Sequence, residues 1–176
     1  IVISCPSNEH ELWHLLNICY EHKGPAAIRY PRGSGIGVQP IPNEVEGFEI
    51  GKAKKIKDGQ SVCILNFGVL MDQIDQIAEK KDYTLYDMRF IKPIDQDALE
   101  HAMQHETIIT LEDNTLLGGC GSAVGEKLHK QKFKGNLLSI GLKDEFPAHG
   151  SRNEILRQNG LDEESIQKTI DNFLRN

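Results

Sequence analysis

The chain has 176 residues, enough for one domain or for one domain with a piece of another. A net charge of −6 argues against a nucleic-acid partner, and 39% hydrophobic residues suffice for a core. No apolar stretch approaches the roughly 20 residues that a membrane helix requires, so we expect no membrane association. Cys5, Cys19, Cys63 and Cys120 are scattered without a CxxC pair, a pattern typical of reduced core thiols in a cytoplasmic protein.

The N-terminal residues predict a β-α-β unit. Ile1–Ser4 is apolar like a buried strand, residues 8–22 follow a helical pattern, and Ala26–Tyr30 is a second strand. Such a unit would be parallel and right-handed, but it is too small to be a domain. We therefore expect it to complete a sheet whose other strands are missing here, and the chain to be the tail of a longer protein.

The next segment, residues 38–60, is typical of a linker. Pro40-Ile41-Pro42 marks extended backbone, and the residues from Phe48 to Gly59 suggest a short hairpin-like edge. The lysines of Lys54–Lys57 are interpreted as guards of an exposed sheet edge rather than as a binding patch.

From Ser61 onward strands and helices alternate with short loops. Strands are predicted at 62–67, 83–88, 107–111 and 137–140, with helices between them and two more at the C-terminus. This alternation predicts an α/β fold with a doubly wound, mainly parallel sheet.

His10-Glu11-Leu12-Trp13-His14 matches the H-E-x-x-H motif of zinc proteases. On a helix, however, His10 and His14 share a face opposite the apolar stripe, which we expect to face solvent. A zinc site needs a third ligand in a protein-lined cleft, so we do not predict one here. The expected apolar stripe consists of Leu12, Leu15, Leu16 and Cys19.

The glycine-rich turn Gly118–Ser122 precedes a helix, where backbone amides favour anions. Its last glycine, Gly125, comes one residue too late for a dinucleotide fingerprint, and the turn lacks the lysine of a P-loop. Close packing of helix and strand is the favoured interpretation.

Polar residues also follow the predicted strands, where a site is conceivable. No nucleophile pairs with them, so loop capping and a subunit contact are the favoured roles. His149 is interpreted first as a turn residue and second as a catalytic acid. These strand-end residues are Asp87, Arg89, Asp95, Glu112, Asp113 and Asn114.

The segment Ile28-Arg29-Tyr30-Pro31-Arg32-Gly33 places two arginines at the carboxyl end of a predicted strand. Ligands of open α/β sheets bind at these ends, and the planar fork of arginine suits a phosphate. The segment therefore predicts either a phosphate-binding corner or a surface turn with solvated arginines.

Together these segments resemble the 1-deoxy-D-xylulose-5-phosphate synthase family, thiamine-diphosphate enzymes of the transketolase group. Each match is weak alone, but their order and spacing are specific. One departure is Lys143, where the family usually has a proline. The matching segments are Cys5-Pro6-Ser7-x-x-x-Glu11, Gly24–Gly33, Ile64–Gly68, Asp87–Asp95, Gly118–Val124 and His149-Gly150.

The resemblance implies that residues 1–37 end a pyrimidine-binding domain, that 38–60 form a linker with short edge strands, and that 61–176 form a transketolase C-terminal domain. It implies a cytoplasmic homodimer that condenses pyruvate with glyceraldehyde 3-phosphate, releasing carbon dioxide, for isoprenoid, thiamine and pyridoxal synthesis. Arg32 matches the family residue that holds the phosphate of the aldehyde. Thiamine diphosphate and magnesium would be bound outside this chain, which would carry no catalytic, cofactor-binding or metal-binding residue and would be inactive alone.

Two alternatives stay open. The chain could be a non-catalytic module for dimer assembly or regulation, or the corresponding domain of a 2-oxoacid dehydrogenase β subunit. Intact mass with sizing would separate a nicked enzyme, which carries its N-terminal remainder as a partner, from a lone module.

Overall fold

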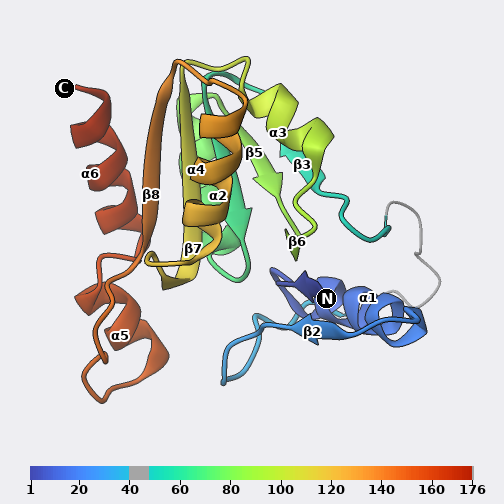
Figure 1. The fold of residues 1–176 in the computed structure, drawn as a ribbon. Helices are drawn as coiled ribbons and strands as arrows, with labels where there is room; N and C mark the ends of the chain where they lie inside the picture. Colours follow the sequence, from blue (N-terminus) through green and yellow to red (C-terminus); the bar gives the residue numbers. More distant parts are fainter. Residues whose placement is uncertain (40–47, 176) are drawn as a thin grey trace.

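The computed structural model describes residues 1–39 and 48–175, which form two sheets (Figure 1). The strands are β1 (Val2–Ser4), β2 (Ala26–Ile28), β3 (Lys54–Lys57), β4 (Gln60–Phe67), β5 (Tyr83–Asp87), β6 (Phe90–Lys92), β7 (Thr107–Thr115) and β8 (Asn136–Leu142). The helices are α1 (Glu9–Glu21), α2 (Met71–Lys81), α3 (Gln96–Ala102), α4 (Cys120–Lys130), α5 (Arg152–Gln158) and α6 (Glu163–Leu174).

The larger sheet has the strand order β3-β5-β4-β7-β8. Strands β5, β4, β7 and β8 are parallel, and β3 joins the edge beside β5 in the antiparallel direction. Buried residues of α2, α5 and α6 belong to the core on one face, whereas those of α3 and α4 belong to the core on the other. The predicted α/β fold with a doubly wound, mainly parallel sheet is therefore confirmed.

The N-terminal unit forms the smaller sheet, in the order β2-β1-β6. Strands β1 and β2 are parallel, as the sequence predicted, with α1 between them along the chain. Figure 1 shows this unit, in blue, at one end of the larger sheet, with α5 at the same end. The third strand, β6, was not predicted; it pairs antiparallel with β1 and thereby ties residues 90–92 to the N-terminal unit.

Several predicted boundaries shift. Strand β2 ends at Ile28 rather than at residue 30, while β7 and β8 run longer than predicted, to Thr115 and Leu142. The edge strand at the lysine cluster is present as β3, but Phe48–Gly51 precedes it as a loop and turn. The prediction for Pro40-Ile41-Pro42 lies outside the described residues.

The predicted orientation of α1 is wrong in part. His14 is buried with 2% exposure, whereas Leu16, which we placed in the apolar stripe, is 54% exposed. The reason is long-range: the ring of His14 stacks on Phe48 with 4.3 Å between centroids. Phe48 comes from the linker, so the helical pattern of α1 alone could not reveal which face it would cover.

Candidate functional site at the carboxyl ends of the parallel strands

The crevice at the carboxyl ends of β4 and β7 lies where the strand order reverses, the usual ligand position in a doubly wound sheet. Here it receives Arg29, from the residue that follows β2. The guanidinium donates to Asp113 Oδ1 over 2.6 Å and to the carbonyl of Phe67 over 3.1 Å. Gly68, with φ of 98°, leaves room for it, since a Cβ there would lie 3.1 Å from Arg29 Nη2. Arg29 is therefore a docking residue between the two units.

Arg32, the predicted phosphate-binding residue, lines two cavities beside this junction, and Asp113 lines one of them. Arg32 lines a cavity of about 420 Å³, together with the turn before α1 and the loop of residues 30–36. It also lines a second cavity of about 260 Å³ beside α5. One further arginine, Arg152 at the start of α5, lines both cavities. Arg152 could not be predicted from the sequence, because its distance from Arg32 along the chain gives no signal.

Three carboxylates accompany these arginines around the cavities. Glu9 Oε1 accepts from the amide of Gly37 over 2.7 Å, and this backbone donation lowers the pKa of Glu9. Asp113 is held by Arg29. Asp72 belongs to the first turn of α2, and its pKa is raised chiefly by burial, while the charge of Arg152 acts in the opposite direction.

Arg89 lies in a buried network at the same junction. Its Nε and Nη2 pair with Glu11 of α1 at 2.7 and 2.8 Å, and its guanidinium covers the ring of Phe48 at 4.0 Å. Both charged side chains are almost fully buried, so Arg89 serves as an internal ion-pair partner in this structure. The H-E-x-x-H glutamate is thus engaged by an arginine rather than available as a general base.

Asp87 ends β5 next to this pair. Ser7 Oγ donates to its Oδ2 over 2.5 Å, and the amide of Arg89 donates to its Oδ1 over 3.2 Å. Burial, followed by the nearby charge of Glu11, raises the pKa of Asp87 to about 7. A carboxyl that titrates near neutrality therefore lies between the two units.

The glycine-rich turn before α4 receives an internal anion. Both oxygens of the fully buried Glu112 accept from backbone amides at the start of α4, those of Cys120 and Gly121, each over 2.8 Å. A Cβ on Gly119 would collide with Glu112 and with the carbonyl of Thr115. Glycine is needed in this turn for close packing, because it leaves room for the Glu112 side chain of β7 to reach the first amides of α4.

The remaining strand-end residues have local roles. Asp95 caps α3 by accepting from the amides of Asp97 and Ala98, and also accepts from Ala53 over 2.8 Å. Asn114 donates to Glu112 over 3.5 Å. His149 is exposed before Gly150 and lines neither of the cavities that contain Arg32.

No group of three or more His, Cys, Asp or Glu side chains within residues 1–39 and 48–175 could hold a metal ion. His10 and His14 pack against each other with 4.7 Å between ring centroids. Over the same ranges, no helix is both long and apolar enough to cross a bilayer.

Comparison with known proteins agrees with this architecture. The transketolase C-terminal domain family matches residues 51–166. The 1-deoxy-D-xylulose-5-phosphate synthases of Idiomarina loihiensis and Mannheimia succiniciproducens are 41% and 45% identical over 99% of this chain. The chain spans 28% of the length of each of these relatives.

Solved transketolase structures share the fold. A split-gene transketolase, described as an inactive β4 tetramer, superimposes with a TM-score of 0.85 at 24% identity, covering 97% of this chain and 57% of that one. Transketolase from Campylobacter jejuni gives a TM-score of 0.59 at 14% identity, covering 96% of this chain and 26% of that one. The strand order, the faces covered by the helices and the sequence match lead to one conclusion: the chain belongs to the transketolase C-terminal domain family.

Proposed function

We propose that this chain is the C-terminal part of a 1-deoxy-D-xylulose-5-phosphate synthase and supplies the corner that binds the phosphate of glyceraldehyde 3-phosphate. The observation that carries the proposal is the position of Arg32. Its side chain lines a cavity at the carboxyl ends of the strands and makes no hydrogen bond or ion pair with any described residue. A guanidinium in that state can place its planar fork of donors on a phosphate dianion.

Arg29 differs from Arg32 because its guanidinium is already bonded within the protein. It belongs to the same short segment, but its Nη1 and Nη2 donate to Asp113 and to the carbonyl of Phe67. Of the two arginines, Arg32 is therefore the one whose donors can reach a substrate, and Arg29 fixes the loop that presents it.

The complete enzyme would condense pyruvate with glyceraldehyde 3-phosphate and release carbon dioxide for isoprenoid, thiamine and pyridoxal synthesis. Thiamine diphosphate, with magnesium, would supply the carbanion chemistry from residues outside this chain. Of the site that such an enzyme needs, this chain would supply the arginine that meets the substrate phosphate. The role of this chain is thus to bind and orient the aldehyde.

Substitution of Arg32 in the full-length enzyme tests this role. We expect Arg32→Ala to raise the KM for glyceraldehyde 3-phosphate by about tenfold or more, the scale of a lost charged hydrogen bond, and to leave the KM for pyruvate nearly unchanged. Exposed Arg175, at the end of α6, provides the control variant Arg175→Ala. An equal effect of Arg32→Ala on both substrates would remove the phosphate role.

Residues 1–37 would then end a pyrimidine-binding domain, 38–60 would form the linker, and 61–176 would form the C-terminal domain. The partner would be the N-terminal remainder of the enzyme, in a cytoplasmic homodimer. The stripe of Trp13, Leu16 and Tyr20 on α1, exposed by 44%, 54% and 89%, supports such a partner. The pure 176-residue chain should show no synthase activity, and turnover by the chain alone would contradict this proposal.

Assembly without catalysis is the second candidate. The split-gene transketolase chain that shares the fold is described as an inactive tetramer. If the present chain has the same role, sizing should find a stable oligomer that does not bind the N-terminal remainder. Co-elution with that remainder, together with recovered activity, would instead favour the synthase.

A further inference from the structure

The two cavities share two arginines that come from distant parts of the chain. Arg32 follows β2 in the N-terminal unit, and Arg152 is the first residue of α5. Within residues 1–39 and 48–175, neither side chain makes a hydrogen bond or an ion pair. Arg29 and Arg89 are both held by carboxylates in the same region. Two arginines without a hydrogen bond or ion pair to the described residues therefore distinguish these cavities from the rest of the junction.

Within residues 1–39 and 48–175, none of the carboxylates that line these cavities forms an ion pair with Arg32 or Arg152. Glu9 is held by the amide of Gly37, and Asp113 is held by Arg29. Asp72 is the remaining acidic side chain of the cavity linings and interacts with the charge of Arg152. Glu9 and Asp72 both stay acidic, but neither is bonded to the two guanidinium groups. The two guanidinium groups repel each other across the shared cavities, and an anion bound by both would offset this repulsion.

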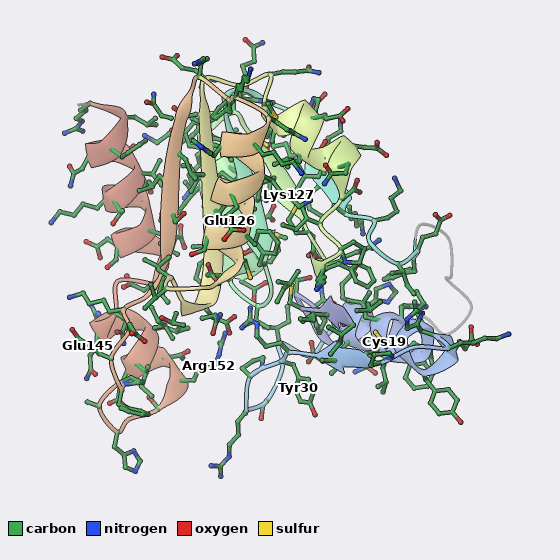
Figure 2. The ribbon with its side chains drawn as sticks, viewed as in Figure 1. Cys19, Tyr30, Glu126, Lys127, Glu145 and Arg152 are labelled. Atoms are coloured by element: carbon green, nitrogen blue, oxygen red, sulfur yellow. The ribbon has the colours of Figure 1, made fainter. Side chains whose placement is uncertain are left out.

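The backbone that carries Arg152 is well fixed. Ser151 caps α5 through a capping box, in which its own amide donates to Glu154 over 2.8 Å. Four residues after Arg152, the side chain of Leu156 is buried in the core of the C-terminal domain. Figure 2 shows Arg152 between α5 and the loop that carries Tyr30. The guanidinium therefore extends from an anchored helix toward the segment that contains Arg32.

We propose that Arg152 is the second phosphate-binding residue of the site, and that it holds the phosphate monoester of a small aldehyde jointly with Arg32. This inference rests on the proposed function of Arg32. Two planar forks can engage different oxygens of one phosphate, which gives both affinity and orientation. Because one arginine belongs to the N-terminal unit and the other to α5, the bound phosphate also links the two units.

The test uses the full-length enzyme with Arg152→Ala, Arg152→Lys and the control Arg157→Ala. Arg157 is an exposed arginine of the same helix that lines neither cavity, so its removal changes the charge equally. We expect Arg152→Ala to raise the KM for glyceraldehyde 3-phosphate about tenfold, with the KM for pyruvate unchanged. Arg152→Lys should recover part of this loss, since it keeps the charge without the fork, and Arg157→Ala should have no effect.

Unphosphorylated glyceraldehyde separates phosphate binding from a structural effect. The kcat/KM for glyceraldehyde should be the same for the wild-type enzyme and Arg152→Ala. If the substitution instead misplaces α5, kcat/KM should fall for both aldehydes, and this result would overturn the inference. If Arg32→Ala raises the KM for glyceraldehyde 3-phosphate but Arg152→Ala does not, the inference is wrong and the proposed function stands. If neither variant changes that KM, both are wrong.

Discussion

Arg29 and Asp113 form an ion pair of 2.6 Å that connects the residue after β2 with the carboxyl end of β7. The two side chains are only 27% and 11% exposed, and the arginine also binds the carbonyl of Phe67. The pair fills the crevice in which a doubly wound sheet usually binds its ligand. The phosphate site that we propose lies beside this pair, in the cavities lined by Arg32.

Removal of Arg29 should loosen this junction. We expect Arg29→Ala to lower the free energy of unfolding by about 2 kcal/mol, because Asp113 and the Phe67 carbonyl would lose a charged donor in a poorly solvated place. Urea unfolding of the chain measures the change. The control is Lys80→Ala, which breaks an exposed 3.7 Å pair with Glu163 and should cost less than about 0.5 kcal/mol. Equal losses for the two variants would contradict the docking role of Arg29.

Asp87 should make stability depend on pH. Its pKa is raised to about 7 in the folded protein, above the ordinary value of 3.8, so between about pH 4 and 7 the folded state binds a proton that the unfolded state has lost. The free energy of unfolding should therefore fall as pH rises through this window and level off above pH 7. Unfolding of Asp87→Asn across the same range should lack this component. Asp75→Asn, on the exposed side of α2, is the control and should keep the wild-type slope.

Two glycines of α4 offer a matched pair. A Cβ on Gly121 would lie 2.7 Å from both Thr110 Oγ1 and Ser139 Oγ, which hydrogen-bond to each other, whereas one on Gly125 would meet only Leu137 at 3.4 Å. Gly121→Ala should therefore lower the free energy of unfolding by about 1–3 kcal/mol through overpacking. The higher helix propensity of alanine should offset only part of this loss. Gly125→Ala should be neutral or stabilising by up to about 1 kcal/mol. Thermal unfolding that ranks Gly121→Ala as the more stable variant would refute the close packing of α4 on the sheet.

The local features of the fold could be predicted from the sequence. The apolar runs of β4, β7 and β8 and the alternation with helices were sufficient for the sheet. What could not be predicted depends on contacts between distant residues. Strand β6 exists because Phe90–Lys92 pairs with β1, and the buried face of α1 is set by Phe48 and Arg89.

In the candidate site too, the local features could be predicted and the long-range contacts could not. The position of Arg32 at a strand end follows from the sequence, and the resemblance to a family singles it out from Arg29. The partner of Arg29 lies 84 residues away, and Arg152 is further still along the chain from Arg32. No periodicity relates such positions, so only the folded structure brings them together.

Equilibrium binding of glycerol 3-phosphate to the full-length enzyme tests the central claim most directly, because it requires no turnover. Calorimetry should give a Kd about tenfold or more weaker for Arg32→Ala than for the wild-type enzyme, with no difference for glycerol itself. Higher salt should weaken wild-type binding more than binding to the variant. An unchanged Kd for Arg32→Ala would contradict the assignment of this corner as the phosphate site.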